Sequence, residues 1–149
     1  MSNFIKGDAI ILYIWDNVSA YKPVACLTSN SLAQTRNIIE SQTKCDPGLV
    51  IKDAGSLTYE ITFEGNYIDT TSTGSADGDK VSHDALKVLL ETGAAETWKM
   101  DTGLTDTTAY YGTGIFSDLT LDSPAGDELA TFSGTLSGSG AITTTDPQV

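Results

Sequence analysis

The chain has 149 residues, a length that fits one domain, and 40% of them are hydrophobic, enough to form a core. It carries 20 acidic and 8 basic residues, so its formal net charge is −12. This excess argues against tight binding to nucleic acid phosphates, which depends on basic groups, and against anionic membrane surfaces. No stretch has the apolar length of a membrane helix, and the first fifteen residues lack signal-peptide features.

The first predicted strand, Asp8–Trp15, is apolar at both odd and even positions. Such a strand must be covered on both faces. One face can pack on the core of the domain. The other face, with Ile11, Tyr13 and Trp15, is either a contact between subunits or is covered within the same domain. A second short strand is predicted over Lys22–Thr28.

The segment Ser31–Thr43 (SLAQTRNIIESQT) is ambiguous. Ser31 and Gln34 imitate a capping box, and the spacing of Leu32 and Ile39 is helical. The β-branched residues and the central Asn37 oppose a helix. Local rules alone lean slightly towards helix.

A connection follows over Lys44–Gly55 (KCDPGLVIKDAG), with a turn signal at each end. Between the turns lies the apolar run Leu49–Ile51. An apolar run in a connection indicates either a contact with another chain or packing against the parent core.

The clearest strand is Ser56–Ile68 (SLTYEITFEGNYI). Apolar residues take the odd positions from Leu57 to Tyr67, and polar residues take the even positions. Side chains of a strand alternate between faces, so one face is apolar and the other is wet and acidic.

Neither a metal site nor a disulfide is predicted. Asp77-Gly78-Asp79 resembles a fragment of a calcium loop but lacks its regular oxygen ligands and closing Glu. Cys26 and Cys45 lie far from any cysteine or histidine cluster, so we expect two reduced structural thiols.

One short helix is predicted over Ser82–Glu91, with Ser82 as its cap, Val81 and Leu86 as a hydrophobic staple, and Gly93 just past its end. His83, the single histidine, is expected on the solvated surface of the first turn. Two further predictions are a strand at Glu96–Asp101 and a strand pair or one bent strand at Ala109–Asp122, with Ile115, Leu119 and Leu121 on one face.

The last strand, Glu128–Ile142, alternates between apolar residues and small hydroxyl residues. Its glycines weaken a lone strand, so it should be paired on both sides. Residues 143–149 form a short polar tail. These patterns predict one mainly β domain over residues 1–149, an antiparallel sandwich or barrel with one short flanking α-helix.

Several runs resemble the major tail tube protein of long-tailed bacteriophages, a family related to the inner tubes of contractile tails and of type VI secretion. They are ACLTSNSL (25–32), IESQTKCDPG (39–48) and YEITFEG (59–65), and the resemblance extends roughly from Gly7 to Ile142. It implies a β-sandwich with a flanking helix and a long loop or hairpin arm. It also implies that Ser31–Thr43 is a strand and not a helix.

The resemblance further implies a structural protein without catalytic residues, cofactor or metal. Its subunits would form six-fold rings that stack into a tube, and the tube would conduct double-stranded DNA into the host cell without binding it specifically. The implied partners are further copies of the chain and the tail terminator, distal tail and tape measure proteins, with no membrane partner. The implied location is the virion tail, assembled in the bacterial cytoplasm.

Three sets of residues are expected to carry this function. Acidic and hydroxyl side chains suit a DNA conduit because basic ones would trap phosphates. The candidates for the lumen wall are Thr58, Glu60, Thr62, Glu64, Thr131, Ser133 and Thr135; an exposed outer face is the alternative for each, since alternation does not say which face meets which solvent. The candidates for the subunit interface are Ile11, Tyr13 and Trp15. The candidates for the contact between rings, in an arm loop over residues 44–55, are Asp46, Pro47, Gly48, Leu49, Val50 and Ile51.

Other functions stay open at this stage. A tube component of a type VI-like or phage-derived bacteriocin injection device would share the fold. A carbohydrate- or calcium-binding β-sandwich module would be a soluble monomer, but the tyrosines are scattered. A glycosidase could use Glu60 and Glu64, but nothing else in the sequence builds a substrate site.

Overall fold

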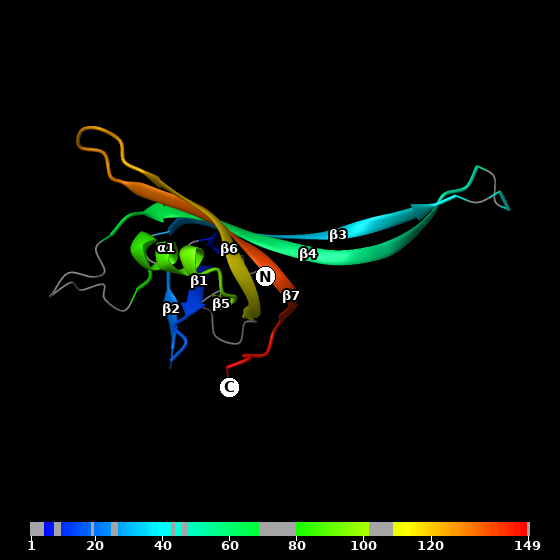
Figure 1. Ribbon diagram of the computed structural model, residues 1–149, viewed down its shortest axis with the longest axis horizontal. Coiled ribbons are helices and arrows are strands. Elements are labelled where there is room, and N and C mark those ends of the chain that lie inside the picture. The colour runs from blue at the N-terminus through cyan, green and yellow to red at the C-terminus, as the bar shows by residue number, and fades with distance from the viewer. Residues whose placement is uncertain are drawn as a thin grey trace.

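The computed structural model describes residues 5–7, 10–18, 20–24, 27–42, 44–45, 48–68, 80–101 and 109–148. Seven strands and one helix are formed within these ranges, so the chain is mainly β, as predicted (Figure 1). In chain order they are β1 (Ile11–Trp15), β2 (Tyr21–Pro23), β3 (Leu27–Ser41), β4 (Ile51–Asn66), α1 (His83–Thr92), β5 (Glu96–Asp101), β6 (Tyr110–Asp122) and β7 (Thr131–Thr143).

All seven strands belong to one antiparallel sheet with the order β2-β1-β5-β6-β7-β4-β3. The sheet curls over its own core. Tyr59 of β4 and Trp98 of β5 are separated by two strands in the sheet, yet their ring centroids are 5.7 Å apart. The sheet does not close into a barrel, because β2 and β3 remain as its two ends. The result is a sandwich-like fold built from a single sheet.

The core lies on the inner side of this curl. It includes Leu12 and Ile14 of β1, Trp98 and Met100 of β5, and Leu86 of α1, all buried. Strands β4 and β7 contribute every second residue, which confirms the alternation predicted for both; the buried side chains are Tyr59, Ile61, Phe63, Phe132 and Leu136. Strand β7 is paired on both sides, with β4 and β6, also as predicted.

Strand β3 confirms that the ambiguous segment is extended as far as Ser41. Register pairs with β4 run from Leu27–Gly65 to Ser41–Ile51, so cross-strand hydrogen bonding overrides the weak local preference for helix. The prediction of a loop over residues 44–55 is wrong from Ile51 onwards, because β4 begins there. The arm is therefore a long two-stranded hairpin that projects away from the body (Figure 1).

Helix α1 begins and ends where the sequence predicts. Gly93 takes the left-handed conformation (φ 72°), and its N–H donates to the Leu89 carbonyl at 3.1 Å. Val81 and Leu86 are both buried, as a hydrophobic staple requires. Ser82 occupies the cap position, but its hydroxyl accepts a hydrogen bond from the Ile68 N–H (3.4 Å) and does not cap the helix.

The prediction of a solvated His83 is wrong. Its residue surface is only 9% exposed, and its ring lies 5.5 Å from that of Tyr67 and 6.5 Å from that of Phe132. The first turn of α1 faces the sheet where β4 ends and β7 begins, so this position is covered. The neighbouring Asp84 accepts a hydrogen bond from the Tyr67 hydroxyl at 2.6 Å.

Strand β6 is one bent strand, the second of the two predicted forms. Its register with β7 shifts between Phe116 and Asp118, which indicates a bulge. The bulge reverses the alternation, so Ile115 is exposed whereas Leu119 packs against the core. The prediction that these two residues share a face is therefore wrong.

Two glycines make room for the contact between Tyr59 and Trp98. A Cβ atom at Gly112 would lie 2.7 Å from the Tyr59 hydroxyl and 2.9 Å from the Trp98 ring, and a Cβ at Gly138 would overlap the Tyr59 ring. The ring cannot easily move, because its hydroxyl donates to the Thr113 carbonyl (2.5 Å) and accepts from Trp98 Nε1 (3.2 Å).

We expect Gly138→Ala to lower the free energy of unfolding by about 1–3 kcal/mol, because the added methyl group overpacks this site. Chemical denaturation of the purified protein measures the change. Gly7→Ala is the matched control, since nothing lies within 4 Å of a Cβ there. Equal stability of the two variants would contradict this account of the core.

Candidate functional site

The outer face of β4 and β7 gathers all seven residues that the sequence assigns to the lumen. Glu60 pairs with Ser137, Thr62 with Thr135, and Glu64 with Ser133. Residues that pair directly across two strands project from the same face of the sheet. The shared face, opposite the core, therefore carries Thr58, Glu60, Thr62, Glu64, Thr131, Ser133 and Thr135.

The neighbouring strands extend this face with residues that the sequence analysis missed. On β3, Ser31 pairs with Thr62, and their hydroxyl oxygens are 2.6 Å apart. On β6, Asp118 pairs with Thr135 and Asp122 with Thr131. The bulge after Phe116 hides the alternation of β6 in the sequence. The period-two pattern read separately on each side of that bulge would have found both aspartates.

We call this four-stranded surface of β6, β7, β4 and β3 the polar face. Its register positions carry four carboxylates, Glu60, Glu64, Asp118 and Asp122, together with many Ser and Thr hydroxyls. No Lys or Arg occupies the paired positions of β4 with β7, of β7 with β6, or of β3 from Ser29 to Thr35. A shallow hollow of about 310 Å³ lies at its centre, between Ser31 and Thr135. The surface can therefore accept hydrogen bonds and repel phosphate groups, but it offers them no cation.

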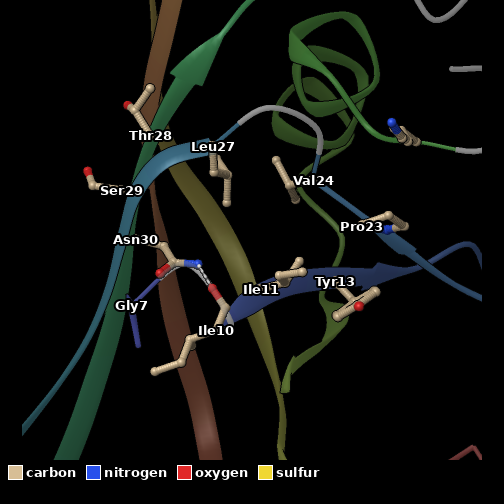
Figure 2. Close-up of a pocket in the computed structure, with 11 residues that line it drawn as sticks. Gly7, Ile10, Ile11, Tyr13, Pro23, Val24, Leu27, Thr28, Ser29 and Asn30 are labelled. Carbon is tan, nitrogen blue, oxygen red and sulfur yellow. Dashed lines mark hydrogen bonds between the residues drawn. The ribbon is translucent and has the colours of Figure 1, made fainter. Parts of the chain in front are cut away.

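A larger groove of about 680 Å³ lies where the two ends of the sheet approach each other (Figure 2). Asn30 of β3 donates from Nδ2 to the Ile10 carbonyl (3.4 Å) and joins the two ends. Most of the lining that the structure describes is apolar or neutral. Within that described lining Lys80 is the one charged residue, and it includes no acid, histidine or cysteine.

The described ranges contain no group of three His, Cys, Asp or Glu side chains that could hold a metal ion. Asp77 and Asp79, the fragment that resembles a calcium loop, lie outside those ranges. No helix in the described part of the chain is long and apolar enough to span a membrane.

The second set of predicted residues, Ile11, Tyr13 and Trp15, lies on the face of β1 opposite to Leu12 and Ile14. All three are half-buried. The Trp15 ring meets Tyr21 edge-on at 5.0 Å. Lys99 of β5 places its ammonium group 5.2 Å from the Tyr13 ring centre, a cation–π distance. The outer side of β1 thus carries an aromatic cluster that its own domain covers only in part.

The C-terminal segment folds back onto this cluster. The Tyr21 hydroxyl donates to Asp146 Oδ1 at 2.8 Å, and Gln148 Nε2 donates to Thr97 Oγ1 at 3.2 Å. Partial burial and the hydrogen bond to the Asp146 carboxylate raise the pKa of Tyr21 well above its ordinary value of 10.0. The polar tail predicted after residue 143 is therefore anchored to β2 and β5.

The third set lies at the tip of the arm. Gly48 has a positive φ of 85°, and Leu49, Val50 and Ile51 are exposed, Leu49 to 64%. Asp46 and Pro47 lie outside the described residues. Cys45 is an exposed, free thiol, and Cys26 lies outside the described residues.

These features define a β protein with a polar, acidic outer face and a projecting hairpin. The family model of the phage tail tube protein matches residues 4–144. The chain therefore belongs to the phage tail tube protein family, as its sequence resemblance predicts. No protein of curated function matches it in sequence.

Solved structures share the fold at low sequence identity. The tail of an empty gene transfer agent particle, refined with C6 symmetry, is 12% identical with a TM-score of 0.73, and the match covers 95% of this chain and 98% of that one. The SPP1 tail tube is 12% identical with a TM-score of 0.67, over 91% and 76% of the two chains. A chain of the anti-feeding prophage baseplate is 8% identical with a TM-score of 0.64, over 96% of each.

We expect the contribution of the Tyr21–Asp146 hydrogen bond to stability to depend on pH. Because folding raises the pKa of Tyr21, the folded state keeps this proton more firmly than the unfolded state. The stabilisation is complete below pH 10 and is lost as the pH rises above it. Tyr21→Phe should lower the free energy of unfolding by about 0.5–1 kcal/mol at pH 8. Thermal melts of both proteins from pH 8 to 11 should show that the difference between their melting temperatures becomes smaller above pH 10. A difference that stays constant would contradict a stabilising hydrogen bond between Tyr21 and Asp146.

Proposed function

We propose that this protein is the subunit of a phage tail tube in which six-fold rings stack around a lumen that conducts double-stranded DNA. Membership of the tail tube family supports the tube. The C6 symmetry of the gene transfer agent tail, which shares the fold, supports the six-fold ring. The observation that carries the conduit is the polar face, with its four carboxylates and no basic residue where β4 pairs with β7 and β7 with β6. The tube would be assembled in the host cytoplasm with terminator, distal tail and tape measure proteins.

The open edges of the polar face support ring formation. Strand β3 has no strand partner on its outer edge in the described part of the chain, and β5 covers β6 only as far as Gly114. The outer edge of β3 in one subunit can therefore meet the second half of β6 in the next. Unpaired edges are a hazard for a monomer, whereas a closed ring of strands removes them.

A ring of this kind has the right size for DNA. Four strands from each of six subunits make a barrel of roughly 24 strands. Strand spacing and tilt then give a bore with a free width of roughly 40 Å, wide enough for a duplex. With Glu60 and Glu64 in its wall, the bore would present acidic side chains to the DNA and no basic side chain that could bind its phosphates.

The remaining surfaces have matching roles. We assign Ile11, Tyr13 and Trp15 to a contact between subunits, because their half-buried side chains form an apolar cluster on the outside of β1. We assign the arm tip, residues 46–51, to the contact between rings, because Leu49, Val50 and Ile51 are exposed at the end of a projecting hairpin.

A tube of an injection device is the second candidate. The structural match to the anti-feeding prophage baseplate favours it, because that particle uses the same fold. Both candidates need the same ring and the same stack. They differ in the cargo, and the particle in which the protein is found distinguishes them.

We expect the purified wild-type protein to form rings or long tubes, because stacking satisfies the exposed edges and the arm. Negative-stain electron microscopy over a range of protein concentrations tests this. A species that remains strictly monomeric at high concentration would overturn the proposed function.

We expect Glu60→Lys combined with Glu64→Lys to leave tubes intact but to make them retain duplex DNA at low salt, with release as salt rises. The matched control is Glu60→Gln with Glu64→Gln, which removes the charge without adding a cation. DNA retention by sedimented tubes and the titre of phage that carry them are the two measurements. Tubes that bind no DNA, together with an unchanged titre, would show that these carboxylates do not line the lumen.

A further inference from the structure

The arm, defined as residues 35–58, has more apolar surface than a free hairpin can hold stably in water. Beyond Glu60 of β4, where pairing with β7 ends, it consists of β3 and β4 alone. An isolated two-stranded hairpin is marginally stable at best. Six large apolar side chains on it are between 44% and 64% exposed: Ile38, Ile39, Leu49, Val50, Ile51 and Leu57. Exposed apolar surface of this extent indicates that the arm is covered by another protein surface.

The hairpin loop between β6 and β7 forms a second projecting end. We call residues 121–130 the β6–β7 tip. Leu129 is 70% exposed and Leu121 is 46% exposed. In Figure 1 the β6–β7 tip and the tip of the arm lie at opposite ends of the longest axis of the molecule.

The two ends differ in charge. The β6–β7 tip carries Asp122, Asp127 and Glu128 and no basic residue. The arm carries Arg36, Lys44 and Lys52, three of the 8 basic residues of a chain whose net charge is −12. Three acidic residues balance them, so the arm is neutral overall while the body is strongly acidic. The arm of one copy can therefore approach the acidic tip of another with less repulsion than the acidic body would meet.

We propose that the arm of one copy binds the β6–β7 tip of a second copy in the adjacent ring, an inference that rests on the proposed tube. Leu49, Val50 and Ile51 of the arm pack on Leu121 and Leu129, and Lys44 of the arm faces the acidic residues of the tip, whereas Lys52 is paired with Glu40 of its own hairpin at 3.5 Å. The two surfaces differ and lie at opposite ends of the molecule, so the contact is heterologous. Repeated along the long axis it does not close, and it gives an open stack.

The exposed thiol of Cys45 allows a direct test. Ala125→Cys places a second thiol on the β6–β7 tip, and Cys26→Ser removes the other native cysteine. We expect a bismaleimide to link Cys45 to the new thiol in assembled tubes and to give a ladder that continues beyond six subunits. Val88→Cys, at an exposed position of α1, is the matched control and should give no ladder.

Charge reversal tests the same contact without cross-linking. Asp127→Lys with Glu128→Lys should reduce the sedimentable tube fraction by about tenfold, because Lys44 of the arm then meets cations. Adding Lys44→Glu to the same chain should restore the tubes, and Lys52 is left unchanged because it is paired with Glu40 of the same hairpin. Exchanging Lys87 and Glu91, the ion pair of α1, is the control and should leave assembly unchanged.

The outcomes separate this contact from the tube itself. If wild-type protein forms neither rings nor tubes, the proposed function and this contact both fail. If wild-type tubes form but no ladder appears, or the ladder stops at six, the arm binds elsewhere and only the contact is overturned. If the charge-reversed tip stacks normally, the contact is overturned as well.

Discussion

The contact between Tyr59 and Trp98 determines the shape of the molecule. It joins two strands that the sheet order keeps two strands apart, so the sheet must curl until its two halves face each other. Gly112 and Gly138 leave the space that these rings fill, and the Tyr59 hydroxyl is held by the Thr113 carbonyl and Trp98 Nε1. The other buried side chains, such as Leu12 of β1 and Ile61 of β4, belong to the same core.

The curl of the sheet also determines which residues lie on its outer face. Because the inner side of β4 and β7 is occupied by core residues such as Ile61 and Leu136, their alternate residues must lie outside. The sequence places carboxylates and hydroxyls at these positions. The same alternation that builds the core therefore produces a continuous polar face, and the proposed conduit follows from it directly.

Much of this could be predicted from the residues. Period-two patterns located β4 and β7 and assigned Glu60, Glu64 and Thr135 to one face, and the glycine after α1 located its end. The pairing partners of the strands could not be predicted, because alternation says nothing about which strands lie together. The aspartates of β6 were missed for a different reason, because the bulge after Phe116 interrupts the alternation of that strand.

Two other errors have related causes. His83 was expected in solvent because a first helical turn often lies there, but the strand ends with Tyr67 and Phe132 cover it. Residues 51–55 of the arm were predicted as part of a loop because turn signals bound that connection on both sides, but the ladder between Ile51 and Ser41 extends β4 into it. In both cases a tertiary contact overrides a local signal.

The short side chains of β7 have a mechanical consequence. Ser133, Thr135 and Ser137 bring no long, flexible group to the polar face. In the proposed tube these short side chains would make the wall smooth. Few of them could reach into the grooves of a moving duplex. A polymer driven along such a wall would meet little friction, so that its speed would be set by the driving pressure and by hydrodynamic drag.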